Sequence, residues 1–466
     1  MPARPGVLFF EIKKQYLRNH PHTAFGTKIA WLALCMFAGA IGLFAQENPY
    51  LDSLQKALPK ATDDTSKVLL LCEMAWESKI NAPNEARSYL DSALRLAQRL
   101  NYLKGLGTAY NYRGVVEDIH GNRTAAIENF QKALAIREQL GDKTGVAKLY
   151  NNIGNVYENL GDQKSSLENY LKALALYREV GDSARVARAS YNLGVLYENV
   201  GNFQAAQAYI LRYLSFAERQ NDTTAIAYAH NVLGNIRMEK EDKMQALAHY
   251  KIALRLHQSQ GNEWEQASVL NNIANALDEI GEDRMDEGKT DSVFQFFQDA
   301  IRFHRQSLHI RKRLDDPDGM GESYNNLGLV YKNIGTFFKN NGRPDTASVY
   351  WQKALVYLDS SLQIRTKLTD QLGIMEVYNG FGDVWRRLGN PDKALQYTQK
   401  YLALAETLHN EKYLQNGYKD LARLYYLKGN YKLAYDWRVR YDELKEQRYN
   451  QDRLKEFESR EVFFRD

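Results

Sequence analysis

The sequence predicts an all-α fold, a solenoid of about nine helical hairpins. A small residue returns at an interval of 40 residues, and each interval holds two apolar stretches with helical spacing. Only 9 prolines occur among 466 residues, so long helices are not interrupted. A chain of this length would ordinarily form two or three globular domains, but a repeat array runs this long as a single body.

The small residue marks the first helix of each hairpin. Its interval is 40 through five copies, 54 twice and then 40 again, at Gly114, Gly154, Gly194, Gly234, Ala274, Gly328, Gly382 and Ala422. Forty residues upstream of the first copy lie Met74 and Ala75, in a degenerate repeat. We therefore predict a solenoid over residues 46–448, with units near 66–103, 104–143, 144–183, 184–223, 224–263, 264–318, 319–371, 372–411 and 412–448.

Each unit is predicted to be two helices joined by a tight turn. In the third unit, the second stretch places Tyr170, Ala173 and Tyr177 at helical spacing. Gly161 and Gly181 are each followed by an aspartate. Glycine accepts the left-handed conformation at a helix end, and aspartate caps the helix that follows.

The first 45 residues have a different character from the rest. Basic residues precede a 16-residue apolar run from Ile29 to Phe44, and Ala45 stands where a peptidase would cut before Gln46. The run is shorter than the ~20 residues that a membrane-spanning helix needs. We expect residues 1–45 to be a cleaved signal peptide, which places the protein in the periplasm or cell envelope. The alternative is an uncleaved N-terminal anchor that associates with a membrane.

Outside this leader the chain is electrically neutral. The leader holds five of the 61 Lys+Arg and one of the 57 Asp+Glu, leaving 56 of each. The basic footprint of a nucleic-acid-binding protein is therefore absent, and we expect no nucleic-acid partner. Cys72 is the one cysteine outside the leader, which excludes a disulfide within the chain and a cysteine-based zinc site.

The repeated residues resemble the tetratricopeptide family from about residue 65 to 448. In that family the first helix carries Leu-Gly-x-x-Tyr and the second carries an aromatic before alanine; Gly154 with Tyr157, and Tyr170 with Ala173, match. The unit is longer than the usual ~34 residues and resembles the variant of kinesin light chains and polarity scaffolds. The resemblance implies a right-handed superhelix whose first helices line a concave groove that binds a protein or an extended peptide.

The first helix of the third unit has an apolar face and a polar face. At about 100° per residue the two sets point in nearly opposite directions. They are Ile153, Val156, Tyr157 and Leu160 against Asn151, Asn155 and Glu158. By the resemblance, the polar set lines the groove.

Asparagine recurs on this polar face. It stands three residues before the small residue at Asn111, Asn151, Asn231, Asn271, Asn325 and Asn379, and one residue after it at Asn155, Asn235 and Asn275. Asparagine is a mediocre helix former, and its amide donates and accepts hydrogen bonds at once. We interpret the set as a ladder for the main chain of a bound peptide. The alternative is that these amides are inherited with the repeat and satisfy neighbouring helix ends.

Charge on the same face changes along the chain. Four residues past the small residue the series is Asp118, Glu158, Glu198, Met238, Asp278, Lys332 and Arg386. An acidic first part and a basic later part would orient a charged ligand, although a solvated face gives such a series as well. Some members of the family grip a terminal carboxylate with lysines of the first helix; asparagine stands at those positions here, which disfavours such a clamp.

The two 54-residue intervals each add 14 residues between the helices of a unit, around EDRMDEGKTDSVFQ and TFFKNNGRPDTASV. Such an addition lengthens both helices by about two turns. The long hairpins would project as a ridge in which Phe294, Phe296, Phe297, Phe337 and Phe338 pack together. A docking surface at this ridge is the alternative.

Motifs for catalysis and metal binding are missing from the sequence. It has no phosphate-binding G-x-x-x-x-G-K-[ST], no H-E-x-x-H and no paired cysteines. His304 and His309 lie five residues apart, and His249 and His257 lie eight apart, so we take them as ordinary surface or groove histidines. We predict no enzyme activity, no catalytic or metal-binding residues and no cofactor.

Residues 449–466 are highly charged and are expected to form a C-terminal helix. The segment resembles the linker that, in tetratricopeptide sensor proteins of Bacteroidetes-like bacteria, leads to a histidine kinase, cyclase or regulator domain. Two function classes follow. The first is a non-catalytic protein- or peptide-binding scaffold, and the second is the sensory part of a signal-transduction protein without its output domain.

Overall fold

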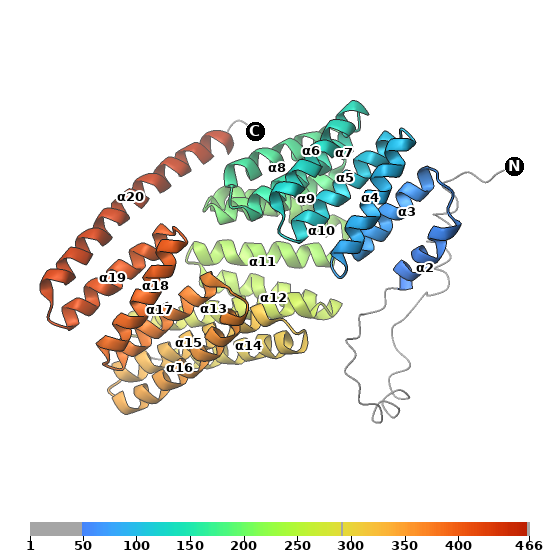
Figure 1. Ribbon diagram of the computed structural model, residues 1–466. Coiled ribbons are helices and arrows are strands. Elements are labelled where there is room, and N and C mark those ends of the chain that lie inside the picture. Colours follow the sequence, from blue (N-terminus) through green and yellow to red (C-terminus); the bar gives the residue numbers. More distant parts are fainter. Residues whose placement is uncertain (1–48, 290–291, 464–466) are drawn as a thin grey trace, which may run out of the picture. The chain divides into compact units, whose positions relative to one another are not determined.

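The computed structural model describes residues 49–289 and 292–463 (Figure 1). Within these residues the chain forms helices and no strand, which confirms the all-α prediction. The predicted leader, residues 1–45, lies outside the described residues. None of the helices that the structure describes is both long and apolar enough to cross a membrane.

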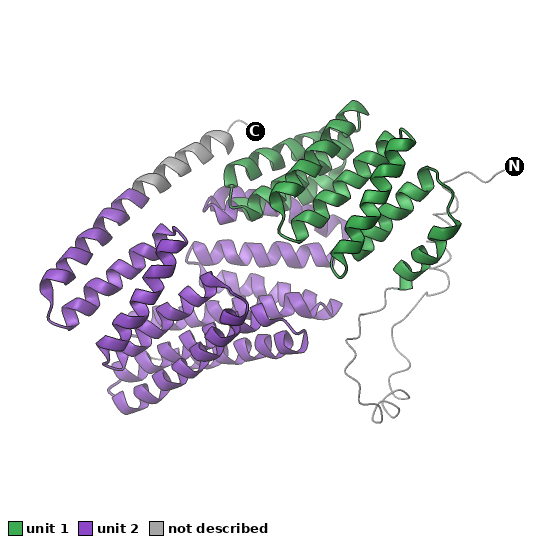
Figure 2. Ribbon diagram, in the orientation of Figure 1, with its two compact units in different colours: residues 1–196 green, residues 197–466 purple. Residues whose placement is uncertain are grey.

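The chain divides into two compact units, Met1–Leu196 and Tyr197–Asp466 (Figure 2). The first unit begins, in its described part, with α2 and a short 3-10 helix, η2. Its helices are α2 (Pro49–Ala57), η2 (Leu58–Lys60), α3 (Thr65–Ser78), α4 (Pro83–Arg99), α5 (Leu103–Ile119), α6 (Arg123–Gln139), α7 (Lys143–Asn159), α8 (Gln163–Glu179) and most of α9 (Ser183–Asn199).

The second unit contains the end of α9 and all later helices. They are α10 (Phe203–Gln220), α11 (Thr223–Glu239), α12 (Lys243–Gln260), α13 (Glu263–Asp286), α14 (Val293–Arg313), α15 (Pro317–Asn340), α16 (Pro344–Lys367), α17 (Gln371–Arg387), α18 (Pro391–Thr407), α19 (Glu411–Leu427) and α20 (Tyr431–Phe463).

Helices pack in sequence order within each unit, as a solenoid requires. In the first unit α3 packs on α4, α5 on α6 and α7 on α8, and each pair packs on the next. The second unit repeats the pattern from α11 with α12 to α19 with α20. First helices of successive hairpins also touch, as α5 does with α3 and α7, and α15 with α13 and α17. The solenoid prediction is confirmed within each unit.

Close contact between the two helices of a hairpin explains the repeated small residue. A Cβ at Gly154 would lie 2.6 Å from the ring of Tyr170. Gly234 stands in the same relation to Tyr250, at 2.4 Å. Glycine therefore leaves room for the aromatic ring of the second helix, which is the large buried residue of the hairpin core.

The turns between helices have the predicted chemistry. Gly161 and Gly181 adopt φ angles of 75° and 72°, in the left-handed region. Asp162 then accepts a hydrogen bond at 3.0 Å from the backbone N–H of Ser165, which caps α8. The glycine ends one helix and the aspartate starts the next.

The two long intervals form the long hairpins α13·α14 and α15·α16. Helices α13, α15 and α16 have 24 residues and α14 has 21, whereas α7 has 17. The ring centroids of Phe294 and Phe338 lie 5.4 Å apart, and those of Phe338 and Tyr350 lie 5.2 Å apart. The two added turns are confirmed for α13, α15 and α16, whereas α14 exceeds α7 by only about one turn. The predicted packing is confirmed for Phe294, Phe337 and Phe338.

The last helix, α20, has 33 residues, and its backbone is helical through most of the predicted C-terminal segment 449–466. Arg448 donates a hydrogen bond to Gln415 of α19, which ties the middle of α20 to its hairpin partner. Side chains beyond Arg448 lie outside the described residues.

Candidate peptide-binding surface

Asparagines link successive first helices in the first unit. The Nδ2 of Asn152 on α7 donates to the Oδ1 of Asn111 on α5 at 3.0 Å. The Nδ2 of Asn192 on α9 donates to the Oδ1 of Asn151 on α7, also at 3.0 Å. Asn111 and Asn151 therefore each accept from an asparagine one residue past the equivalent position in the next hairpin.

The second unit repeats this link. Asn272 on α13 donates to the Oδ1 of Asn231 on α11 at 3.1 Å. Asn326 on α15 donates to the Oδ1 of Asn271 on α13 at 3.2 Å. These asparagines thus bond side chains of the neighbouring hairpin and not the helix ends that the alternative interpretation named.

The link occupies the amide oxygen and leaves the amide nitrogen. Asn111, Asn151 and Asn231 are half-buried, and within the described part of the chain no acceptor bonds to their Nδ2 groups. Because the oxygen is held from the neighbouring hairpin, the orientation of each amide is set. A set of oriented N–H donors is what an extended main chain with its carbonyl oxygens would meet.

Other predicted ladder residues lie in different surroundings. Asn271 is buried, donates to Glu322 at 2.8 Å and lies 2.8 Å from the Nδ1 of His304. Asn325 is also buried and donates to Asn326 at 3.4 Å. Asn379 is exposed. Asn271 has partners for both halves of its amide, so it acts in the core of its hairpin.

Two of the three asparagines after the small residue contact the tyrosine of the second helix. The hydroxyl of Tyr170 lies 2.6 Å from both Asn155 Oδ1 and Glu158 Oε2, and donates its proton to one of them at a time. The hydroxyl of Tyr250 donates to Asn235 Oδ1 at 2.9 Å. Asn275 accepts from Asn326 at 3.4 Å. The amide oxygens thus join Asn155 and Asn235 to the core of their own hairpins and Asn275 to the next hairpin.

The helical wheel of α7 is largely reproduced. Ile153 and Val156 are buried, Asn155 is exposed, and Asn151 is half-buried. Leu160 is 51% exposed, so its assignment to the apolar face was wrong. It is the C-cap residue of α7, where the chain leaves the helix for the turn.

The acidic positions of the polar face are partly buried. Burial raises the pKa of Glu198 to about 7, with Glu239 adding to the shift, while the hydrogen bond from Asn235 at 2.9 Å opposes it. Burial likewise raises the pKa of Asp278 to about 7, with Glu282 adding and a bond from Asn333 opposing. Both carboxyls therefore change charge near neutral pH.

The basic positions surround an aspartate that the sequence did not single out. Arg386 pairs with Asp383, Arg387 lies 3.1 Å from it, and Lys332 lies 3.8 Å from it. Burial raises the pKa of Asp383, but Arg387, Lys332 and Arg386 outweigh it and hold that pKa below its ordinary value. The structure thus brings the two predicted basic residues together on α15 and α17.

The histidines divide into two kinds. His257 and His304 are fully buried, so their prediction as surface or groove residues was wrong. Burial lowers the pKa of His304 to about 3 and keeps it neutral. The Nδ1 atoms of His230 and His249 lie 2.8 Å apart. No group of three or more His, Cys, Asp or Glu side chains that could hold a metal ion occurs among the described residues.

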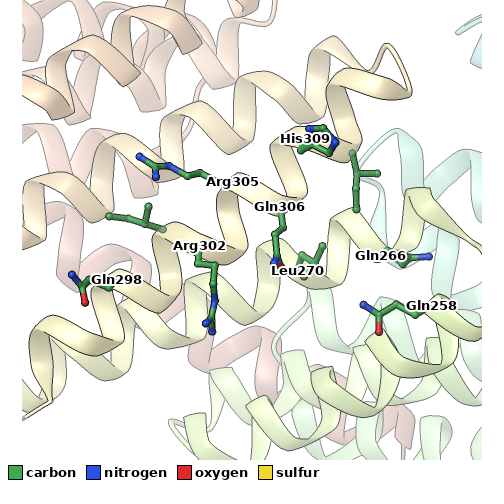
Figure 3. Close-up of a pocket in the computed structure, with 10 residues that line it drawn as sticks. Gln258, Gln266, Leu270, Gln298, Arg302, Arg305, Gln306 and His309 are labelled. Carbon is green, nitrogen blue, oxygen red and sulfur yellow. The ribbon is translucent and has the colours of Figure 1, made fainter.

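A surface depression of about 580 Å³ lies on α12, α13 and α14 (Figure 3). Its lining residues are mostly polar and include Gln258, Gln266, Arg302 and Arg305. Arg302 pairs with Asp299 at 2.9 Å, and Arg305 donates to the hydroxyl of Tyr331 at 2.9 Å. Its arginines therefore already have partners in the protein, and none of the predicted ladder residues lines it.

Sequence reasoning missed the donor asparagines of the link, which are Asn152, Asn192, Asn272 and Asn326. The signal was available, since three of them form Asn-Asn pairs with a ladder asparagine. Their separation from the acceptors is one residue more than the repeat interval, 41 or 55. That offset identifies a contact between neighbouring hairpins.

Comparison with known proteins agrees with this architecture. A sequence model of the tetratricopeptide repeat family matches residues 145–219. No curated protein matches the chain in sequence.

Solved structures of similar fold cover most of the chain. A Rap protein complexed with competence and sporulation factor has a TM-score of 0.55 and 12% identity, covering 83% of this chain and 100% of that one. The apo form of the quorum sensor NprR from B. thuringiensis has a TM-score of 0.52 and 12% identity, covering 76% and 92%. Aspartyl phosphate phosphatase F from Bacillus subtilis has a TM-score of 0.51 and 11% identity, covering 83% and 95%. Residues 145–219 are thus similar in sequence to the tetratricopeptide repeat, within a chain whose fold is a helical solenoid of the tetratricopeptide type.

Proposed function

We propose that this protein is a non-catalytic scaffold that binds a protein or an extended peptide on the polar faces of its first helices. The observation that carries the proposal is the set of oriented amides at Asn111 and Asn151 in the first unit and Asn231 in the second. Their oxygens are held by the next hairpin, and their Nδ2 groups are left to donate. A ligand main chain supplies the matching acceptors.

The remaining polar residues predicted for the groove would contribute less to ligand binding than these three asparagines. Asn155 and Glu158 share the hydroxyl of Tyr170, so a ligand has to compete with that contact. Asn271 and Asn325 are buried and would act by holding the first helices in register. Two proteins of similar fold support the proposal: a Rap protein solved in complex with competence and sporulation factor, and the quorum sensor NprR.

The amide donors are tested by changing Asn111, Asn151 and Asn231 to aspartate. Aspartate has the same shape and still accepts the bond from the next hairpin, but it has no N–H to offer. Peptides selected from a display library on the unmodified chain should bind the triple variant at least ~10-fold more weakly, since three hydrogen bonds of about 0.5–1.5 kcal/mol each are lost.

The matched control changes the other partner of each hydrogen bond. Asn152→Ala and Asn192→Ala remove the donors of the link but leave the amides of Asn111 and Asn151 in place. This variant should lose thermal stability and retain more peptide affinity than the aspartate variant. Equal affinity of the aspartate variant and the unmodified chain would rule out the ladder, and failure to select any peptide would rule out the binding function.

A second candidate is the sensory part of an exported signal-transduction protein. The length of α20 favours it, because its 33 residues continue well beyond the 17 of its hairpin partner α19, as a helix leading to another domain would. A histidine kinase or cyclase reading frame immediately downstream in the genome would support this candidate. Co-purification of that gene product with the chain would then decide between sensor and scaffold.

A further inference from the structure

Three first helices of the second unit bring a group of charged residues together. Lys332 lies on α15, Asp383, Arg386 and Arg387 on α17, and Asp420 and Arg423 on α19. Besides its contact with Asp383, Arg387 donates to the Thr336 hydroxyl at 2.6 Å. We call these six charged residues the cation cluster.

Positive charge in the cluster is not cancelled. Asp383 is shared by three cations, Lys332, Arg386 and Arg387. Arg423 is exposed, and its pKa is lowered first by burial and then by the positive charge of Arg386. Arg387 also lowers the pKa of Arg423, whereas Asp383 and Asp420 oppose the shift.

The two aspartates of the cluster do not neutralise its excess positive charge. Burial raises the pKa of Asp420 to about 6, and Asp383 adds to the shift, so Asp420 is charged above neutral pH. Lys419 also acts on Asp420, and Asp278 is influenced by Lys332. Within the six residues of the cluster, four cations face two carboxyls at pH 7.5.

The cations are also held in position before any ligand arrives. The side chains of Lys332 and Arg386 are 16% and 13% exposed. Arginine and lysine lose much rotamer freedom when they are fixed on a ligand, and here most of that cost is already met by folding. Arg423 stays exposed at the edge of the cluster, where it can close on a bound group.

We propose that the cation cluster is an oxyanion site that takes an acidic side chain or a phosphate group of the chain bound on the first-helix faces. This inference rests on the proposed function, and it names a property of the ligand. Guanidinium groups in pairs match the planar carboxylate and the tetrahedral phosphate. The site differs from a carboxylate clamp, because its cations lie after the repeated small residue and not three residues before it.

Sulfate is the first probe, since it keeps its charge between pH 5 and 8. The full chain is titrated with sulfate by calorimetry at pH 7.5, with sodium chloride adjusted to hold the ionic strength constant. We expect saturable binding. Arg423→Gln should weaken it roughly three- to tenfold, the effect of one unit charge near a solvent-facing site. Arg438→Gln, at an exposed arginine paired with Asp442 on α20, is the matched control and should change nothing.

A second variant moves affinity in the opposite direction. Asp420→Asn removes a negative charge at nearly constant volume, so it should tighten sulfate binding by a similar factor. A merely structural role of these residues predicts a loss with both variants. Absence of saturable sulfate binding, or weaker binding in Asp420→Asn, would overturn the inference.

Two further probes separate the sources of the oxyanion. N-acetylaspartate amide presents a single carboxylate, and N-acetyl-phosphoserine amide presents a phosphate; each should displace sulfate. The tighter of the two identifies the group that the ligand carries, and failure of both to displace sulfate contradicts the assignment. Because no peptide is used, loss of the oxyanion site leaves the library selection above as a separate test of the binding function.

Discussion

At the scale of single residues, a buried ion network shows how polar groups stabilise a helical solenoid. Glu117 on α5 is buried and accepts from Arg87 Nε and Nη2, both at 2.9 Å. Arg113 and Asn122 also donate to it, at 3.1 Å and 2.8 Å. Because both oxygens accept hydrogen bonds, the carboxylate stays charged in the core despite the cost of removing it from water. The hydrogen bonds from Arg87, followed by those of Asn122 and Arg113, lower the pKa of Glu117 to about 2 against the opposing effect of burial.

Replacing Glu117 with glutamine should therefore destabilise the first unit in a pH-dependent way. The folded pKa lies below the ordinary value, so the charged network stabilises the fold above about pH 4.5 and loses that effect as pH falls toward 2. We expect a loss of about 1–3 kcal/mol at pH 7 that shrinks between pH 5 and 2. Urea midpoints of the two proteins at a series of pH values measure it.

Glu128→Gln is the control for this change, because Glu128 is an exposed residue of the neighbouring helix α6. It should leave the urea midpoint unchanged at every pH. A deficit in Glu117→Gln that stays constant from pH 7 to pH 3 would show that shape, and not the ionised network, is what Glu117 contributes.

At the scale of helices, each hairpin is set by one glycine and one ring. The ring of Tyr170 on α8 fills the space above Gly154 on α7, and Gly114 with Phe130 repeats the arrangement at 2.5 Å. An ion pair at the end of the second helix joins one hairpin to the next. Arg365 at the end of α16 pairs with Asp370, whose other oxygen caps α17 at the N–H of Gly373, 3.0 Å away. Helix ends and helix contacts are thus determined by a few repeated pairs.

Gly154→Ala should loosen the hairpin α7·α8. Its Cβ would lie 2.6 Å from the Tyr170 ring, so the helices have to separate or the ring has to leave its position. We expect a loss of about 1–3 kcal/mol, although alanine is the better helix former. Thermal melting by circular dichroism measures it, with Lys164→Ala at an exposed position of α8 as the control. An unchanged or raised melting temperature would show that the close approach is not required.

At the scale of the whole molecule, the periodic features were predictable from the sequence, whereas the contacts between side chains of different repeats were not. The spacing of Gly114, Gly154 and Gly234 was sufficient to place the hairpins, because only a small residue permits that helix contact. Asp383 was overlooked because its role depends on cations from α15 and α17 that meet only in the folded chain. His304 was misassigned because periodicity locates a face of a helix and not the depth at which it is buried.

The repeated asparagines are both a periodic feature of the sequence and a contact between repeats. Their recurrence indicated a shared purpose, and both interpretations considered from the sequence concern the same amide. In the folded chain the oxygen of Asn151 bonds the neighbouring hairpin while its nitrogen has no acceptor among the described residues. Stacking of repeats and binding of a ligand are therefore compatible demands on one side chain.

The predicted leader bears on where the whole molecule acts. Its apolar run from Ile29 to Phe44 has 16 residues and would span about 24 Å as a helix, less than the ~30 Å of a bilayer core. We therefore expect export with cleavage before Gln46, which removes the excess positive charge and releases a neutral chain. Intact mass of the protein from an envelope fraction should match residues 46–466. Full-length protein that remains with the membrane after a high-salt wash would show instead that the leader is retained as an anchor, and binding of partners would then take place at the membrane surface.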